Sequence, residues 1–173
     1  FLEVGTVTPD YQPGNPSPRI FRLVEDESLI SRTGFNNCGV DVALEHIRRH
    51  RKHSYILGVN INKNPLSVGE QILKDFELVF TRLYESVDYF TLNWGSIDKE
   101  SFAKVLENFT TFREAVNKRC SIFIKLPANI DEKELDLVIS LAYKYSTEGF
   151  IATGPTMDRS ELHQTKTKQL EKI

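Results

Sequence analysis

Polar residues end several apolar segments of this chain, where they could form a binding or catalytic site. Lys125 is the sharpest case, because it lies inside the apolar segment SIFIKL and burying an ammonium group is costly. Asn93 and Ser96 end a second segment, FTLNWGS. Such a serine either belongs to a site or forms a turn before the next helix. A site requires these side chains to meet in one pocket.

The apolar segments have the length of strands, and helical patterns fit between them. Strands are predicted at residues 2–7, 55–61, 89–93, 121–126 and 149–153, buried on both faces because apolar residues do not alternate strictly. Four apolar stripes recur at helical spacing. They are Val40, Ala43, Leu44 and Ile47; Val68, Ile72, Phe76, Val79 and Leu83; Phe102, Val105, Phe109 and Phe112; and Leu135, Val138, Leu141 and Ala142.

Local signals indicate where two of these helices begin. Ser67 with Glu70, and Asp131 with Glu134, have the spacing of a capping box. Residues 8–19 contain four prolines, which exclude a helix and most ladder pairing. We expect this stretch to be an ordered, proline-rich loop over the surface.

Strand and helix alternate along the chain, which predicts an α/β fold with parallel strands. An open doubly wound sheet and a (β/α)8 barrel both fit this order. The sequence contains neither GxGxxG nor GxxxxGK[ST], which weakens the first and nucleotide binding of those kinds. In a barrel, the site lies at the carboxyl ends of the strands, where this chain has its polar residues.

Composition and residue spacing argue against binding of nucleic acid or metal and against a membrane-spanning segment. The 173 residues are 40% hydrophobic with a net charge of −2, so no broad basic surface favours nucleic acid as a partner. No segment approaches the roughly 20 apolar residues of a membrane span. Cys38 and Cys120 lack metal-type spacing, and His46 and His50 lack a third ligand, so no metal site is predicted.

Six segments together resemble one enzyme family. They are EVGTVTP followed by QPGNPSPRIFRL, RTGFNNCGVD, LGVNINKN, YFTLN, FIKLP and GFIAT. In order and spacing they resemble the motifs of the dihydroorotate dehydrogenases, specifically the quinone-linked, membrane-associated class that uses FMN. The resemblance runs over nearly the whole chain.

The resemblance implies an enzyme of pyrimidine biosynthesis that oxidises dihydroorotate to orotate and passes electrons to quinone. The family removes a proton from C5 with a serine while hydride leaves C6, and Ser96 matches that serine in the NxxS pattern after Asn93. FMN contacts of the family fall on Thr6, Asn60, Asn93, Lys125 and Thr153. The resemblance also implies a cytoplasmic protein, peripheral on the inner membrane.

The substrate-side positions depart from the family pattern. Ser31 precedes the RTGF motif where the family has asparagine, Asp98 takes an asparagine place, and Gly154 replaces another asparagine. Asn93 and Phe35 are retained. Losing several buried hydrogen bonds would weaken substrate binding by orders of magnitude, and the Asp98 carboxylate would repel an anionic substrate. A non-catalytic or truncated relative of the family is therefore the alternative hypothesis.

The expected architecture is a partial TIM (β/α)8 barrel of the FMN-linked oxidoreductase type. A full barrel typically needs about 250 residues, and the resemblance covers strands two to six. Residues 1–173 are thus predicted to form a single incomplete barrel domain, with residues 154–173 as a polar segment leading to missing strands. Open edges of such a sheet favour self-association, and without the family's phosphate-binding loops we expect weak FMN binding.

Overall fold

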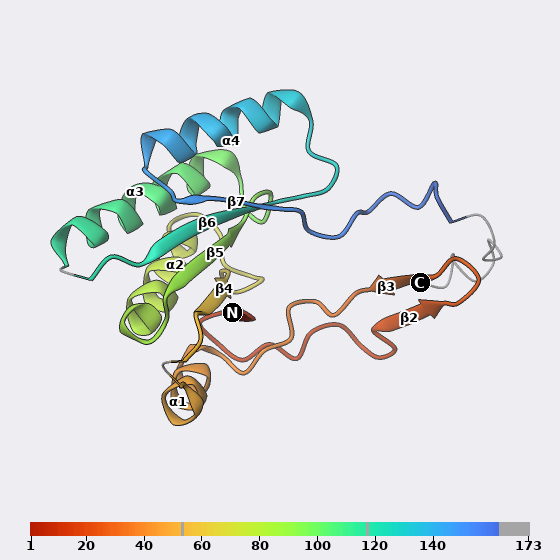
Figure 1. Cartoon of the computed structure of the whole chain (residues 1–173), viewed down its shortest axis with the longest axis horizontal. Helices are drawn as coiled ribbons and strands as arrows, with labels where there is room; N and C mark the ends of the chain where they lie inside the picture. Colours follow the sequence, from red (N-terminus) through yellow and green to blue (C-terminus); the bar gives the residue numbers. More distant parts are fainter. Residues whose placement is uncertain (53, 117, 163–173) are drawn as a thin grey trace.

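A five-stranded parallel sheet forms the centre of the molecule (Figure 1). The computed structural model describes residues 1–52, 54–116 and 118–162. Strand order across the sheet is β1-β4-β5-β6-β7, so the strands lie side by side in the order in which they occur. Their bounds are Leu2–Val7 (β1), Leu57–Ile61 (β4), Tyr89–Asn93 (β5), Ser121–Leu126 (β6) and Gly149–Ala152 (β7).

Helices connect the strands of the sheet and cover one of its faces. Their bounds are Val40–His50 (α1), Glu70–Leu83 (α2), Lys99–Ala115 (α3) and Glu132–Lys144 (α4), with a short 3-10 turn at Tyr84–Ser86 (η1). Alternate strand residues, among them Val59, Phe90 and Ile122, are fully buried in the core beneath these helices. Phe80 of α2 and Phe109 of α3 stack there, with ring centroids 3.7 Å apart.

The prediction that all five strands are buried on both faces is wrong for three of them. β4 and β5 are buried almost throughout, but half-buried residues alternate with buried ones along β6, and most of β1 and β7 is not buried. The helices cover only the outer face, while the inner face is open in this chain. Strict burial therefore holds only at the centre of the sheet.

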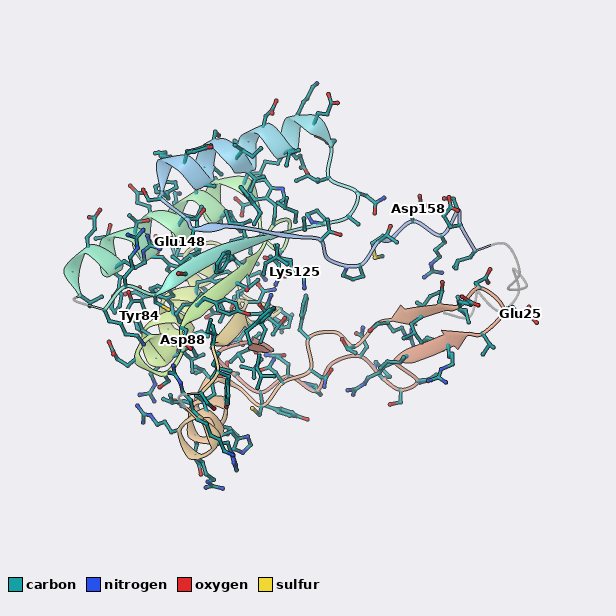
Figure 2. The ribbon with its side chains drawn as sticks, viewed as in Figure 1. Glu25, Tyr84, Asp88, Lys125, Glu148 and Asp158 are labelled. Atoms are coloured by element: carbon teal, nitrogen blue, oxygen red, sulfur yellow. The ribbon has the colours of Figure 1, made fainter. Side chains whose placement is uncertain are left out.

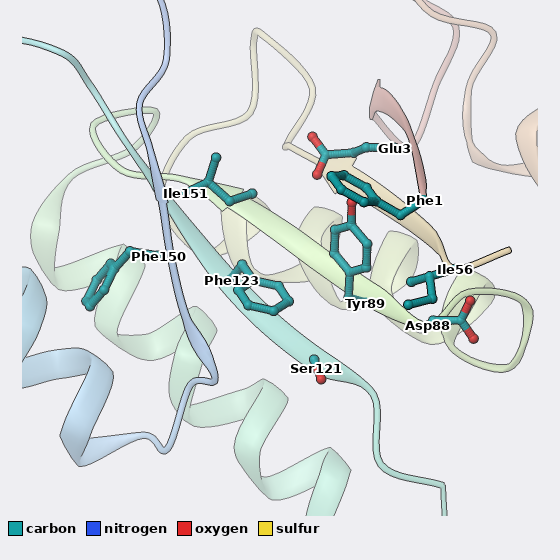
Figure 3. A pocket seen from close by; sticks show the side chains of 9 residues that line it. All are labelled: Phe1, Glu3, Ile56, Asp88, Tyr89, Ser121, Phe123, Phe150 and Ile151. Carbon is teal, nitrogen blue, oxygen red and sulfur yellow. The ribbon is translucent and has the colours of Figure 1, made fainter.

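The open inner face forms an apolar cavity of about 720 Å³ near the amino ends of the strands. Figure 3 shows its lining: Phe1, Glu3, Ile56, Asp88, Tyr89, Ser121, Phe123, Phe150 and Ile151. Tyr89 covers Gly58 of the neighbouring strand, and a Cβ at Gly58 would collide with its ring. β1 and β7 are the edge strands of the sheet. Self-association through these edges stays a prediction.

One of the two predicted helix starts is confirmed. Asp131 caps α4, since its side chain accepts a hydrogen bond of 2.8 Å from the Glu134 N–H. The Ser67 cap is wrong, because α2 begins at Glu70 after Gly69 and the Ser67 hydroxyl donates to Asp75 at 2.6 Å instead. The Ser67 hydroxyl therefore binds the Asp75 carboxylate and does not cap the backbone N–H groups of the helix. Val68, placed in the apolar stripe of α2, lies before the helix and is 76% exposed.

An antiparallel hairpin extends away from the sheet and was not predicted. Its strands are Ile20–Leu23 (β2) and Ser28–Ser31 (β3), seen to the right in Figure 1. Residues 8–19 form neither helix nor strand, apart from one bridge between Gln12 and Asn37. Of the polar segment predicted at residues 154–173, the described part, 154–162, is likewise irregular, and the rest lies outside the described residues.

Ion pairs connect elements at the amino ends of the strands, opposite Lys125 (Figure 2). Glu148, just before β7, pairs with Arg113 of α3 at 2.9 Å and accepts a hydrogen bond of 2.7 Å from the Ile122 N–H. Burial alone would raise the pKa of Glu148, but this N–H and the guanidinium groups of Arg119 and Arg113 outweigh it and lower the pKa. Glu148 thus joins α3, β6 and β7 as a carboxylate.

We expect Glu148→Gln to lower the free energy of unfolding at pH 7 by about 1–3 kcal/mol, since Arg113 would lose its partner while its side chain is only 8% exposed. Because the folded-state pKa lies below the ordinary value of 4.5, the contribution is complete above that pH and is lost as the pH falls through the folded pKa. Urea titrations across this pH range measure it.

Glu114→Gln is the matched control, because Glu114 is exposed on the same helix. It should change the unfolding free energy by less than about 0.5 kcal/mol. A Glu148→Gln penalty that stays constant down to pH 3 would contradict the assigned role.

Candidate active site

The carboxyl ends of β4, β5 and β6 bring three polar side chains to the inner face of the sheet. Asn93 pairs with Lys125 across β5 and β6, and Asn60 pairs with Thr91 across β4 and β5. Residues two apart on a strand share a face, so Asn93 and Thr91 point the same way. Asn60, Asn93 and Lys125 therefore meet at one rim.

Hydrogen bonds join two of these residues to Thr6 at the end of β1. The Asn60 and Asn93 amides bond reciprocally: Asn93 Nδ2 donates to Asn60 Oδ1 at 2.8 Å, and Asn60 Nδ2 donates to Asn93 Oδ1 at 3.1 Å. Thr6 Oγ1 donates to the same Asn60 Oδ1 at 2.9 Å. Asn60 is only 6% exposed. These three side chains form a connected wall whose geometry is fixed by its own bonds.

A cavity of about 630 Å³ lies against this wall. Of the predicted site residues, Thr6, Asn60, Asn93, Lys125, Ser96, Phe35 and Gly154 line it. The rest of the lining is Glu3, Gly5, Asn62, Trp94, Gly95, Leu126, Pro127, Pro155 and Met157. A volume of this size is in the range of small-molecule and cofactor sites.

Lys125 is the only cation that lines this cavity within the described part of the chain. Its backbone carbonyl accepts a hydrogen bond of 2.9 Å from the Trp94 N–H, which ties the loop after β5 to β6. No described residue forms a hydrogen bond or ion pair with its ammonium group. A half-buried ammonium beside amides suits a ligand that carries or develops negative charge.

Ser96 lies in a turn directly after β5. Gly95 has a φ of 83°, a conformation that glycine adopts readily, and the Ser96 N–H returns to the Asn93 carbonyl at 3.3 Å. Trp94 is 6% exposed and packs edge-on against Phe102 of α3, with ring centroids 5.0 Å apart. Ser96 is thus held at the cavity by a rigid neighbour, and its hydroxyl bonds to no described residue.

Three predicted site residues do not line the cavity. Ser31 ends β3, paired with Ile20 in the hairpin. Asp98 is exposed and caps α3, where its hydrogen bonds from Ser101 lower its pKa. Thr153 is exposed, and its hydroxyl donates to the Gly154 carbonyl at 3.0 Å. The expected repulsion between Asp98 and an anionic substrate therefore has no support in this geometry.

Glu3 and its neighbours were missed by sequence reasoning. Thr91 Oγ1 donates to Glu3 Oε2 at 2.7 Å, and Glu3 lines both cavities of the inner face. Burial, followed by the charge and hydrogen bonding of Glu3, raises the pKa of Tyr89 to about 12. A single acid within the apolar segment LEVGTV was the available signal.

The described residues contain no helix long and apolar enough to cross a membrane. Residues 1–52, 54–116 and 118–162 also hold no group of three or more His, Cys, Asp or Glu side chains suited to a metal ion.

We expect Asn93→Leu to lower the free energy of unfolding by about 1–3 kcal/mol, because it leaves the buried Asn60 Nδ2 without its acceptor, while Asn60 Oδ1 keeps only Thr6 as a donor. Ser96→Ala is the matched control. It lines the same cavity but forms no side-chain hydrogen bond with the described residues, so its effect should stay within about 0.5 kcal/mol. Equal stability of the two variants in urea titrations would show that the amide pair contributes little.

The whole chain is similar in sequence to known dihydroorotate dehydrogenases. The family described as dihydroorotate dehydrogenase matches residues 1–173. The dihydroorotate dehydrogenase (quinone) of Coxiella burnetii is 37% identical over 172 residues, covering 92% of this chain and 49% of the relative. That of Teredinibacter turnerae is 36% identical over 181 residues, covering 97% and 53%. The chain spans about half the length of the curated relatives it matches.

Solved structures agree. A crystal structure of ligand-free DHODH (dihydroorotate dehydrogenase) from Eimeria tenella has a TM-score of 0.85 at 26% identity, covering 98% of this chain and 55% of that chain. The complex of DHODH from Eimeria tenella with ferulenol gives 0.83 at 26% identity, over 96% and 53%. This likeness confirms the predicted fold class, with the barrel left open. Because the family matches residues 1–173, the whole of the given sequence, this chain belongs to the dihydroorotate dehydrogenase family.

Proposed function

We propose that this chain supplies the flavin side of an active site that oxidises dihydroorotate to orotate with FMN and passes electrons to quinone. The observation that supports this most is that Thr6, Asn60, Asn93 and Lys125 line one cavity together with Ser96. Relatives named dihydroorotate dehydrogenase (quinone) support the reaction and the acceptor. The resemblance to the quinone-linked class is the basis for proposing a role in pyrimidine biosynthesis and peripheral attachment to a membrane.

The cavity fits the ring system of FMN. Amide groups of Asn60 and Asn93 offer donors and acceptors at the rim, as a heteroaromatic ring requires, and the Lys125 ammonium has no partner among the described residues. FMN, when bound, supplies the acceptor for the hydride that leaves the substrate. The described lining includes no second cation, so these residues can bind the flavin ring, but they offer no cation for the phosphate group of FMN.

Ser96 is the proposed base that takes the proton from the substrate carbon. Serine is a weak base, so it needs fixed placement and little competing water. The Gly95 turn and the packed Trp94 ring provide the placement, and the hydroxyl is not committed to any described residue. Lys125 would stabilise the negative charge that the FMN ring gains when it is reduced.

On the substrate side we propose Phe35, Asn93 and Gly154, all of which line the cavity. Gly154 leaves this wall without a side chain: a Cβ there would approach only the Leu126 carbonyl at 3.6 Å and Lys125 at 3.8 Å. This observation favours the alternative, a relative of the family that binds flavin and has lost its grip on dihydroorotate. Flavin binding without turnover would identify that case.

Trp94, the only tryptophan of the chain, reports directly on this cavity. We expect FMN to quench its fluorescence on binding. Lys125→Met should weaken FMN binding by about 10- to 100-fold, since a charge-assisted hydrogen bond is worth about 1.5–3 kcal/mol. Lys133→Met, an exposed lysine on α4, is the matched control and should bind FMN as the wild type does. FMN binding that is equal in all three proteins would overturn the assigned role of Lys125.

Ser96→Ala tests the chemistry separately. Turnover of dihydroorotate in the FMN-saturated protein should fall by at least about 100-fold, because general base catalysis typically contributes 10²–10⁴-fold. FMN affinity by Trp94 quenching should stay within twofold of wild type. Unchanged turnover would assign the base to another residue, while loss of FMN binding would make Ser96 a structural residue.

A further inference from the structure

Phe35 lies at the mouth of the cavity in an unusual backbone conformation. Its φ is 55°, in the left-handed region that bulky side chains rarely adopt, and it is 49% exposed. It nevertheless lines the cavity. An exposed aromatic ring gains little from packing, so something else must hold this residue in place.

Asn37 contacts the Phe35 backbone directly. Asn37 Nδ2 donates to the Phe35 carbonyl at 2.8 Å and to Thr8 Oγ1 at 3.0 Å. Its Oδ1 accepts from the Gly39 N–H at 2.9 Å and from the Thr8 N–H at 3.2 Å. The amide thus uses both its donor and its acceptor, and it joins its own loop, at Phe35 and Gly39, to Thr8.

The orientation of this amide is determined by its partners. Two of them are backbone N–H groups and one is a backbone carbonyl, so exchanging the oxygen and nitrogen of Asn37 would oppose all three. Backbone bonds add to the attachment, since the Asn37 N–H donates to the Gln12 carbonyl at 3.1 Å and its own carbonyl accepts from Gln12 at 3.0 Å. Asn37 is therefore anchored independently of Phe35.

Thr8 connects Asn37 to the strand that carries a residue of the site. It follows directly after β1 and is only 1% exposed, and its hydroxyl also donates to the Asp10 carbonyl at 2.7 Å. Thr6, two residues earlier, belongs to the polar wall of the cavity. Asn37 therefore joins the Phe35 turn to the residue that directly follows β1, the strand that carries Thr6.

We propose that Asn37 is a positioning residue for substrate binding, which holds Phe35 at the mouth of the cavity through the Phe35 carbonyl. This inference rests on the proposed function, because it assigns Phe35 to the substrate side. Asn37 touches neither the reacting atoms nor the cavity itself. Its effect should therefore be seen in affinity for the substrate class, an anionic pyrimidine, and not in affinity for flavin.

Asn37→Asp is the sharpest variant. The carboxylate keeps both backbone N–H contacts and can accept from the Thr8 hydroxyl, but it opposes the Phe35 carbonyl with an oxygen. Asn37→Ala removes every side-chain hydrogen bond of this residue, keeps its backbone bonds to Gln12, and serves as the second variant. Asn36→Ala is the matched control, because Asn36 is an exposed neighbour of the same type with no side-chain hydrogen bond in the described structure.

The first measurement is hydrogen exchange of residues 33–39, followed by mass spectrometry on the complete chain. We expect Asn37→Asp to accelerate exchange in this segment by about tenfold and Asn37→Ala by more, with Asn36→Ala unchanged. Unchanged exchange in Asn37→Asp would overturn the positioning role, whether or not the protein binds a ligand.

The second measurement is calorimetric titration of the FMN-saturated protein with orotate. Asn37→Asp should weaken orotate binding by about tenfold, with FMN affinity within twofold of wild type. Phe35→Ala should weaken it by a similar factor, and the double variant should be no weaker than Phe35→Ala alone, because both changes act through one ring. Additive losses would overturn the proposal.

The two measurements separate the possible failures. If wild type binds no orotate, the proposed function fails on the substrate side, and faster exchange in Asn37→Asp still supports the attachment of Phe35. If orotate binds and Asn37→Asp binds it equally well, the positioning role fails while the proposed function stands.

Discussion

Parallel pairing in one register is the constraint on which the candidate site depends. Asn93 lies beside Lys125, and Asn60 beside Thr91, because neighbouring strands run in the same direction without a slip between β4 and β6. A shift of one residue would turn each of these side chains to the opposite face of the sheet. The bond from Asn60 to Asn93 and the placement of Lys125 therefore depend on the register of the backbone ladders to which these residues belong.

The same alternation separates two environments within each strand. Outer-face residues such as Phe90 and Ile122 are excluded from water beneath the helices, which favours pairing of the strands through the hydrophobic effect. Inner-face residues are polar at the carboxyl ends and largely apolar toward the amino ends. Glu3 lies where these regions meet, and its carboxylate adds to the effect of burial in raising the pKa of Tyr89.

Sequence reasoning recovered the features that depend on local pattern. The five sheet strands, the four helices and the Asp131 cap follow from apolar periodicity and side-chain chemistry over a few residues. Lys125 could be singled out because burying an ammonium group inside an apolar strand is costly unless it has a function. That Thr6, Asn60 and Asn93 would be placed together came from strand direction and from the resemblance to a family.

The remaining errors arise from contacts between residues distant in sequence. Asp75 attracts the Ser67 hydroxyl only because α2 brings the carboxylate to that loop. Asp98 was expected beside the substrate, whereas the free N–H groups at the start of α3 bind its side chain. The β2–β3 hairpin escaped prediction because its strands are only four residues long, lie beyond the proline-rich segment and mix polar or charged residues with apolar ones.

The ion pairs at the amino ends have a consequence for how such proteins diverge. Glu148 with Arg113, and Asp88 with Arg51, join elements at the amino ends of the strands, at the opposite edge of the sheet from Lys125. Residues at the carboxyl ends of the strands can then be substituted during evolution without weakening those ion pairs. Related sheets can then bind different ligands on one architecture, and Gly154, where the resemblance implies an asparagine, is a position of that kind.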